Sequence, residues 1–340
     1  MDSITQAALG AAVGETLLGR KVGNKAPIWG AILGTLPDLD VFFNPLMSQV
    51  EQLSFHRGPS HSILFALVVA PLVGAGLTRL HRQYQISWKE WGVLAFLCIV
   101  THPLLDTLTN YGTQLFWPFT NYPVTWASIA IIDPLYTVPL LLGVIVAMIV
   151  RKPERRSVWN RWGVILSSAY LLLTMGNKLY VDSVFRGELQ EQGIAYNQFM
   201  TTPTVLNNLL WTGLAANESR VWVALYSVFD GGQPVRFKTF EKRSEVIAES
   251  MNEPAIQKLL WFSQGYYTIE VSGDSTLFHD MHVGRRDAFI EEDSRFIFSF
   301  LLLRDTLSDR YTDFRPLEMS FDVDSETWNR FWRRVWGEHP

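Results

Sequence analysis

Long apolar runs fill the first half of the chain and are replaced by short ones in the second. Four runs approach or reach the roughly 20 residues that an α-helix needs to cross a bilayer core. They span about 63–80, 91–108, 129–150 and 162–179. Two shorter stretches at 3–18 and 26–43 are rich in Gly and Ala and either span within a bundle or insert only partly. The pattern predicts an α-helical transmembrane bundle of about six segments.

The pattern changes near residue 180. Short runs of β-branched and aromatic residues, such as "SRVWVALYSVFD" and "RFIFSFLLL", are separated by Gly, Pro, Asp and Asn, which is typical of strands. The stretch 241–262 has a helical pattern, with Pro254 near a boundary. We therefore expect a membrane-embedded helical domain over 1–179 and a mixed α/β domain outside the membrane over 180–340.

The basic residues predict the orientation of the apolar segments. They gather in alternate connections: Arg20, Lys21, Lys25, Arg79, Arg82, Lys89, Arg151, Lys152, Arg155, Arg156 and Arg161. The stretch 109–128 contains neither Lys nor Arg. By the positive-inside rule the basic connections face the cytoplasm, so both termini and the C-terminal domain lie outside it. The N-terminus has no basic segment before its apolar part, and a cleavable signal peptide is not expected.

Composition excludes several classes of protein. The formal net charge is −4, so no basic field indicates a nucleic-acid partner. The single cysteine, Cys98, excludes an internal disulfide framework and a cysteine-rich zinc module. Hydrophobic residues make up 48% of the chain, with 13 Trp and 21 Phe, which is more apolar than an ordinary soluble protein. The partner that composition indicates is the lipid bilayer.

Histidine and aspartate collect at the outer ends of four predicted segments. The residues are Asp38, Asp40, His56, His61, His102, Asp106 and Asp133, and Arg57 follows His56 at the same end. The orientation rests on Lys and Arg alone, so this convergence is a largely separate observation. Ionisable groups at membrane depth are costly and are functional candidates by default.

The spacing of these residues suits a metal ion. His102 and Asp106 are four residues apart, on one face of a helix. Asp38 and Asp40 follow Pro37, where a broken backbone lets both carboxylates point inward. Nitrogen and oxygen ligands suit Zn²⁺ best, with Mn²⁺ and Fe²⁺ as alternatives. We expect one or two divalent ions, with ligands drawn from Asp38, His56, His61, His102, Asp106 and Asp133.

Several of these residues have a second interpretation. Asp133 precedes Pro134 at a helix start, where an N-cap is as good an explanation as a metal ligand. Arg57 either binds an anionic group of a substrate or anchors the chain at the headgroups. Glu15 is a candidate partner of Arg20. His279 and His282 of "HDMH" point to opposite faces of an expected strand and are not expected to form a site.

Five motifs in order resemble a known family. "MDSITQAALGAAVGE", "GTLPDLD", "HRGPSHS", "HPLLDTLTNYG" and "DPLYT" cover residues 1 to about 140. Together they resemble the YdjM-type inner-membrane metal-dependent hydrolases, a bacterial family that has also carried a LexA-binding label. The later "TTPTVLNNLLW" resembles the envelope domain of longer members. The resemblance implies a bacterial inner-membrane protein with hydrolase activity.

A more distant likeness is to the zinc-dependent phospholipase C and P1 nuclease group. "HPLLD" is similar to the HxxxD pair of that group, with His102 and Asp106 at the matching positions. Asp38 or Asp40 would correspond to its core aspartate, and His61 or His56 to its core histidine. The chain offers fewer histidines than that group, which favours one or two ions over three.

The leading hypothesis is a metal-dependent hydrolase of an ester or phosphoester, with a lipid or lipid-linked substrate, at the outer face of the inner membrane. Asp40 is the candidate base or bridging ligand, and Arg57 the candidate partner of a phosphate. One alternative is a non-catalytic metal-binding scaffold or regulator whose C-terminal domain binds an unidentified partner. It predicts closed metal coordination, whereas an enzyme needs an open position. An ion transporter is the third hypothesis, and it predicts further polar groups toward the cytoplasmic side, of which the sequence shows few.

Overall fold

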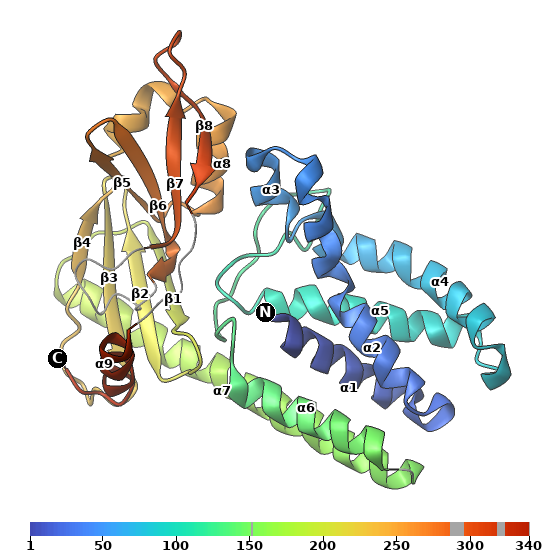
Figure 1. Ribbon diagram of the computed structural model, residues 1–340. Coiled ribbons are helices and arrows are strands. Elements are labelled where there is room, and N and C mark those ends of the chain that lie inside the picture. Colours follow the sequence, from blue (N-terminus) through green and yellow to red (C-terminus); the bar gives the residue numbers. More distant parts are fainter. Residues whose placement is uncertain (151, 286–295, 318–323, 340) are drawn as a thin grey trace. The chain divides into compact units, whose positions relative to one another are not determined.

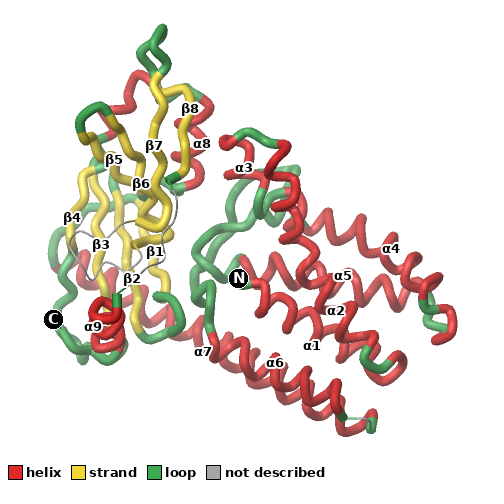
Figure 2. The backbone as a smooth tube through the Cα atoms, in the orientation of Figure 1, coloured by secondary structure: helices red, strands yellow, loops and turns green. Residues whose placement is uncertain are grey.

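The computed structural model describes residues 1–150, 152–285, 296–317 and 324–339 and divides into two compact units. The helical unit contains residues 1–45 and 55–176 together with 205–207. The sheet unit contains 46–54 and 177–204, and continues from 208. All described strands follow the long helices of the helical unit along the chain, and Figure 2 shows these strands gathered in the sheet unit. A helix continues across residue 180 to Glu191 and the first strand begins at Gln198, so the change of structure comes later along the chain than the change of sequence pattern.

The helical unit consists of α-helices joined by short 3₁₀ helices (Figure 1). Its elements are α1 (Ser3–Val22), α2 (Lys25–Thr35), η1 (Leu36–Leu46), η2 (Pro59–His61), α4 (Ile63–Leu80), η3 (Arg82–Tyr84), α5 (Trp88–Asp106), α6 (Pro134–Ile149) and the first part of α7 (Pro153–Glu191). The short α3 (Gln49–Phe55) falls mainly in the sheet unit.

Within the described part of the chain, two helices are long and apolar enough to cross a membrane, where the sequence predicts about six segments. They are α4, which has the bounds predicted from the apolar run, and α7. Helix α6 is apolar but has 16 residues, and α2 has 11 because Pro37 stops it. Helices α1 and α5 are long enough, but each carries three charged side chains. The six-segment bundle therefore stays a prediction.

Small residues bring α1 and α2 into backbone contact. A Cβ atom on Gly10 would overlap the carbonyl oxygen of Gly30, and one on Gly14 would overlap that of Ala26. Glycine is required at both positions because any side chain would push the helices apart. The spacing of Gly10 and Gly14 thus serves close helix packing.

A buried ion pair joins α1 to α7. Arg156 donates from Nε and Nη2 to the two carboxylate oxygens of Glu15, at 2.7 and 2.6 Å. Asn160 of the same helix donates to the carbonyl oxygen of Ala12 at 3.0 Å. Glu15 therefore pairs with Arg156, and the expected pairing with Arg20 is wrong. Arg20 is exposed and hydrogen-bonds to Ser157.

Two four-stranded antiparallel sheets make up most of the sheet unit. The first has the order β1 (Gln198–Pro203), β2 (Leu210–Ala216), β3 (Arg220–Ser227), β4 (Lys238–Glu241). The second has the order β5 (Tyr267–Ser272), β6 (Ser275–Arg285), β7 (Phe296–Arg304), β8 (Tyr311–Pro316). The helical elements of the C-terminal part are η4 (Ser244–Ser250), α8 (Pro254–Phe262) and α9 (Ser325–Val335). The region is thus dominated by antiparallel sheet rather than evenly mixed, and Pro254 begins α8.

Candidate metal centre

Three elements of the helical unit deliver the candidate ligands to one place. After α2 ends at Thr35, the chain continues through Pro37 as the 3₁₀ helix η1, which carries Asp38 and Asp40. His61 ends η2, immediately before Ser62 caps α4. His102 and Asp106 lie in the last turns of α5. The loop after α5 hydrogen-bonds to the segment around His61, because Gln114 N donates to the Arg57 carbonyl oxygen at 3.0 Å.

Asp38, His61 and His102 form a triangle of ligand atoms. Asp38 Oδ1 lies 3.4 Å from His61 Nε2 and 3.3 Å from His102 Nε2, and the two Nε2 atoms are 3.2 Å apart. Ligands about 2.0–2.1 Å from a tetrahedral Zn²⁺ are separated by about 3.3–3.4 Å. The triangle therefore has the dimensions of one face of a tetrahedral site. Both imidazoles are buried, whereas the Asp38 side chain is 24% exposed and leaves one side open.

The proton on His102 is placed by the backbone. Its Nδ1 lies 2.6 Å from the carbonyl oxygen of Gly34. A carbonyl oxygen accepts only, so Nδ1 carries the proton, and in the neutral ring Nε2 presents a lone pair. This is the arrangement in which a histidine ligates a metal through one nitrogen and is oriented through the other.

The proton on His61 is placed by a relay through Ser60. Ser60 Oγ lies 2.7 Å from Asp40 Oδ2, and the ionised carboxylate can only accept, so the hydroxyl proton points to Asp40. The same Oγ lies 3.0 Å from His61 Nδ1 and must then accept from it. Nε2 of His61 thus presents a second lone pair. Burial lowers the pKa of His61 to about 4, so this ring is neutral near pH 7.

Asp106 lies next to the triangle and is held from several sides. Its Oδ2 is 3.7 Å from each histidine Nε2 and 3.7 Å from Arg57 Nε. Its Oδ1 accepts hydrogen bonds from Gln6 Nε2, at 2.9 Å, and from the amino nitrogen of Met1. The charge of Asp106 is therefore balanced locally. Asp38 Oδ1, by contrast, faces the two imidazole Nε2 atoms, and among the described residues it has no Lys or Arg as an ion-pair partner.

Arg57 is buried and faces inward. Its Nη1 donates to Thr109 Oγ1 at 3.3 Å, and its guanidinium lies 4.5 Å from the centroid of the Tyr111 ring. The side chain is 9% exposed, in a residue with the left-handed φ of +61°. Of the two interpretations of Arg57, this position disfavours anchoring at headgroups and favours a role beside the carboxylates.

Asp40 and His56 lie behind His61 rather than on the triangle. Asp40 Oδ1 is 2.9 Å from His56 Nδ1, and Asp40 Oδ2 is 3.6 Å from His61 Nδ1. His56 is 33% exposed and so forms the rim of the cluster. This geometry suits Asp40 to orienting His61 through Ser60.

Asp133 is placed apart from the cluster. It caps α6 by accepting from Leu135 N at 3.1 Å, and Tyr170 donates to its other carboxylate oxygen at 2.8 Å. Of the two interpretations of Asp133, the structure shows the N-cap.

Gln6 belongs to the centre but does not stand out in the sequence. Its side chain is 1% exposed and donates to both Asp106 and the His102 carbonyl oxygen, while its Oε1 accepts no hydrogen bond from the described residues. The available signal is a lone amide at the start of a small-residue helix, and that pattern is also typical of ordinary helix packing.

Comparisons with known proteins agree with the motif order. A family described as the YdjM inner membrane protein matches residues 1–180, which include the whole cluster. The inner membrane protein YbcI of Escherichia coli (strain K12) is 29% identical over 120 residues, covering 35% of this chain and 68% of that protein. No solved structure gives a significant match, and the likeness to phospholipase C and P1 nuclease receives no support. The match to more than half of the chain shows that this is a membrane protein belonging to the YdjM inner membrane protein family.

Proposed function

We propose that Asp38, His61 and His102 hold a divalent metal ion and that the protein is a metal-dependent hydrolase of esters or phosphoesters. The observation that carries the proposal is the convergence of two imidazole lone pairs and one carboxylate at the spacing of tetrahedral ligands. Each ring hydrogen-bonds through Nδ1 away from the triangle, His102 to the Gly34 carbonyl oxygen and His61 to Ser60, and so directs Nε2 into it. A cation is what satisfies such a set, and two nitrogens with one oxygen suit Zn²⁺.

The neighbouring residues suit hydrolysis. A divalent ion supplies Lewis acidity and lowers the pKa of a coordinated water. A set of three protein ligands leaves a further position for water or substrate, as in catalytic zinc sites. Asp106 presents a carboxylate oxygen beside the triangle that would accept a hydrogen bond from a water bound there. Arg57 adds a positive charge next to it, which favours the negative charge that develops on a phosphoester.

The surroundings of the centre favour a substrate from the membrane. The connections α1–α2, α4–α5 and α6–α7 lie at one end of the helical unit, and the N-terminus lies at the other (Figure 1). The basic residues occupy the connected end, which by the positive-inside rule faces the cytoplasm. The centre then faces outward. Its own element η1 and the nearby loop expose large aromatic side chains, with Phe42 75% and Phe119 87% exposed. Such side chains suit the headgroup level, so we propose a lipid or lipid-linked substrate.

The first test is the metal content of the full chain, purified in a neutral detergent without chelators. We expect close to one Zn, Mn or Fe per chain in the wild type by mass spectrometry, and loss of that metal in Asp38→Asn, His61→Ala and His102→Ala. His81→Gln is the matched control, because His81 accepts a hydrogen bond from Trp29 Nε1 at 2.8 Å and lies outside the cluster. It should keep its metal.

The second test is hydrolysis by the metal-loaded protein. Aryl phosphomonoesters, aryl phosphodiesters and phospholipids would be compared, with the His102→Ala variant as the blank. Metal-dependent turnover of one class supports the enzyme. A stoichiometric metal with no turnover would favour the non-catalytic scaffold. Absence of metal after incubation with Zn²⁺, Mn²⁺ and Fe²⁺ would overturn the metal centre itself.

A further inference from the structure

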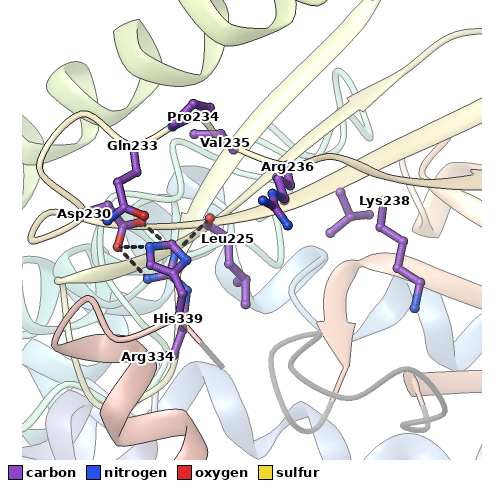
Figure 3. Close-up of a pocket in the computed structure, with 11 residues that line it drawn as sticks. Leu225, Asp230, Gln233, Pro234, Val235, Arg236, Lys238, Arg334 and His339 are labelled. Atoms are coloured by element: carbon purple, nitrogen blue, oxygen red, sulfur yellow. Dashed lines mark hydrogen bonds and ion pairs between the residues drawn. The ribbon is translucent and has the colours of Figure 1, made fainter.

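The sheet unit contains a cavity of about 540 Å³ that lies entirely within that unit. Its walls come from β3, from the connection between β3 and β4, and from the end of α9 together with His339 (Figure 3). This volume lies within the range that accommodates a small organic molecule. None of the residues of the candidate metal centre lines it.

One side of the cavity is neutralised by its own residues. Arg334 donates to both carboxylate oxygens of Asp230 at 2.6 Å, and its Nη2 also donates to the Leu225 carbonyl oxygen at 3.2 Å. His339 Nε2 lies 3.5 Å from the same carboxylate. Both Asp230 and Arg334 are buried. Asp230 is the one carboxylate among the lining residues, and its negative charge is balanced by Arg334. It therefore does not balance the charge of Arg236 or Lys238.

The other side of the cavity carries two basic side chains. Arg236 and Lys238 lie two residues apart, are exposed, and stand away from the Asp230–Arg334 pair in Figure 3. Among the described residues neither has a carboxylate partner, and the ammonium of Lys238 lies 5.7 Å from the centroid of its neighbour Phe240. Three permanent cations and one carboxylate line the cavity, which leaves two positive charges.

The space between these two sides is apolar. Val223 and Leu225 line it and lie two residues apart on β3, so their side chains share one face of the sheet, and Pro234 of the connection adds further apolar surface. A ligand that fits must therefore combine an apolar body with about two negative charges. Near neutral pH a phosphate monoester carries about 1.5 to 2 negative charges, whereas a carboxylate carries one.

We propose that this cavity binds a phosphate monoester with a short apolar chain, its phosphate held by Arg236 and Lys238 and its chain against Val223 and Leu225. Arginine provides paired N–H donors for phosphate oxygens, and lysine adds a second charge. The proposal goes beyond the metal centre and does not depend on it, because no metal ligand lines the cavity. The same chemistry is offered by a soluble monoester and by the headgroup of a phosphatidic acid.

The test is calorimetric titration of the full detergent-solubilised chain with hexyl phosphate in the presence of a chelator. The chelator removes any contribution from a metal centre. We expect saturable binding that is at least tenfold tighter than that of inorganic phosphate or hexanol. Arg236→Gln combined with Lys238→Gln should weaken it at least tenfold, and each single substitution by less. Arg220→Gln is the control, because Arg220 is an exposed cation of β3 outside the lining.

The outcomes separate the ligand sources and can overturn the proposal. Binding of hexyl phosphate indicates a soluble monoester. Binding to nanodiscs that contain phosphatidic acid but not to hexyl phosphate, with the same dependence on Arg236 and Lys238, assigns a lipid. Binding of neither, or an equal loss in Arg220→Gln, overturns the site. Both substituted side chains are exposed, so the variants should fold, and circular dichroism checks this.

Discussion

The helical unit contains two buried polar clusters that differ in whether their charges balance. Glu15 and Arg156 have side chains 1% and 8% exposed, and each supplies what the other lacks: two carboxylate oxygens against two N–H donors. The triangle of Asp38, His61 and His102 has a 24% exposed carboxylate and two imidazole Nε2 atoms that face each other at 3.2 Å, and it contains no Lys or Arg.

The difference indicates separate roles for the two clusters. A bidentate ion pair is complete without a ligand, and it fixes the docking of α1 on α7. The triangle, under the proposal made above, is completed by a cation from outside. Burying polar groups without compensation is unfavourable, so its retention in an apolar surrounding is better explained by a ligand than by packing. Variants that affect one cluster should therefore leave the other intact.

The largest effect is expected from Arg156→Ala. It leaves the Glu15 carboxylate buried without its partner, which costs about 3–5 kcal/mol of stability. The measurement is thermal unfolding of the detergent-solubilised chain, with metal content determined on the same sample. Metal content should stay at the wild-type value, because Arg156 pairs with Glu15 and is not part of the triangle.

The double variant Glu15→Leu/Arg156→Met is the control for Arg156→Ala. It removes both charges and retains the volume, so it should recover most of the lost stability. A double variant as unstable as Arg156→Ala would show that packing, and not the unpaired charge, sets the cost.

The second effect is stabilisation by the metal. A ligand that binds only the folded state stabilises it by about 2.7 kcal/mol at a hundredfold excess over its Kd. A chelator should therefore lower the unfolding midpoint of the wild type by several degrees. The same shift is expected in Arg156→Ala, and none in His102→Ala. An equal shift in His102→Ala would place the metal elsewhere.

Part of the fold and of the centre was predictable because it depends on local geometry. The apolar run at 63–80 became α4 with the same bounds, since hydropathy over about 20 residues reports the helix directly. His102 and Asp106 lie together because four residues make one helical turn. His279 contacts Ser299 and Glu270, whereas His282 contacts Asp280. Separate partners are what side chains on opposite faces of a strand predict.

The rest depends on contacts between distant residues or on groups without a side-chain signature. The Gly34 carbonyl that orients His102 lies 68 positions away and belongs to a glycine. Arg156 is 141 positions from Glu15, whereas the expected partner Arg20 is its neighbour on the helix. The signal at Asp133 was ambiguous because Asp before Pro serves equally as a cap, and Tyr170, which completes that role, comes 37 positions later. The local sequence pattern predicts at which end of a helix a residue lies, but not which distant residue it hydrogen-bonds or pairs with.

The smallest effect is expected from Ser60→Ala, which leaves all three ligands in place and removes the group that orients one of them. Without the Ser60 oxygen, His61 Nδ1 loses its acceptor at 3.0 Å, and Asp40 loses a donor at 2.7 Å. Loss of such a supporting contact weakens metal binding by about 10–100-fold. The measurement is the Kd for Zn²⁺ by competition with a fluorescent chelator.

Thr107→Ala is the matched control, because it removes a hydroxyl one residue after Asp106 that donates to the Leu104 carbonyl oxygen at 2.7 Å and to none of the cluster residues. It should leave the Kd unchanged. An unchanged Kd in Ser60→Ala would mean that Asp40 itself, 3.6 Å from Nδ1, is sufficient to hold the His61 proton. In that case Asp40→Asn, and not Ser60→Ala, should give the loss of affinity. If neither substitution changes the Kd, His61 is not a ligand, and the balanced pair at Arg156 and the triangle do not differ in the way proposed.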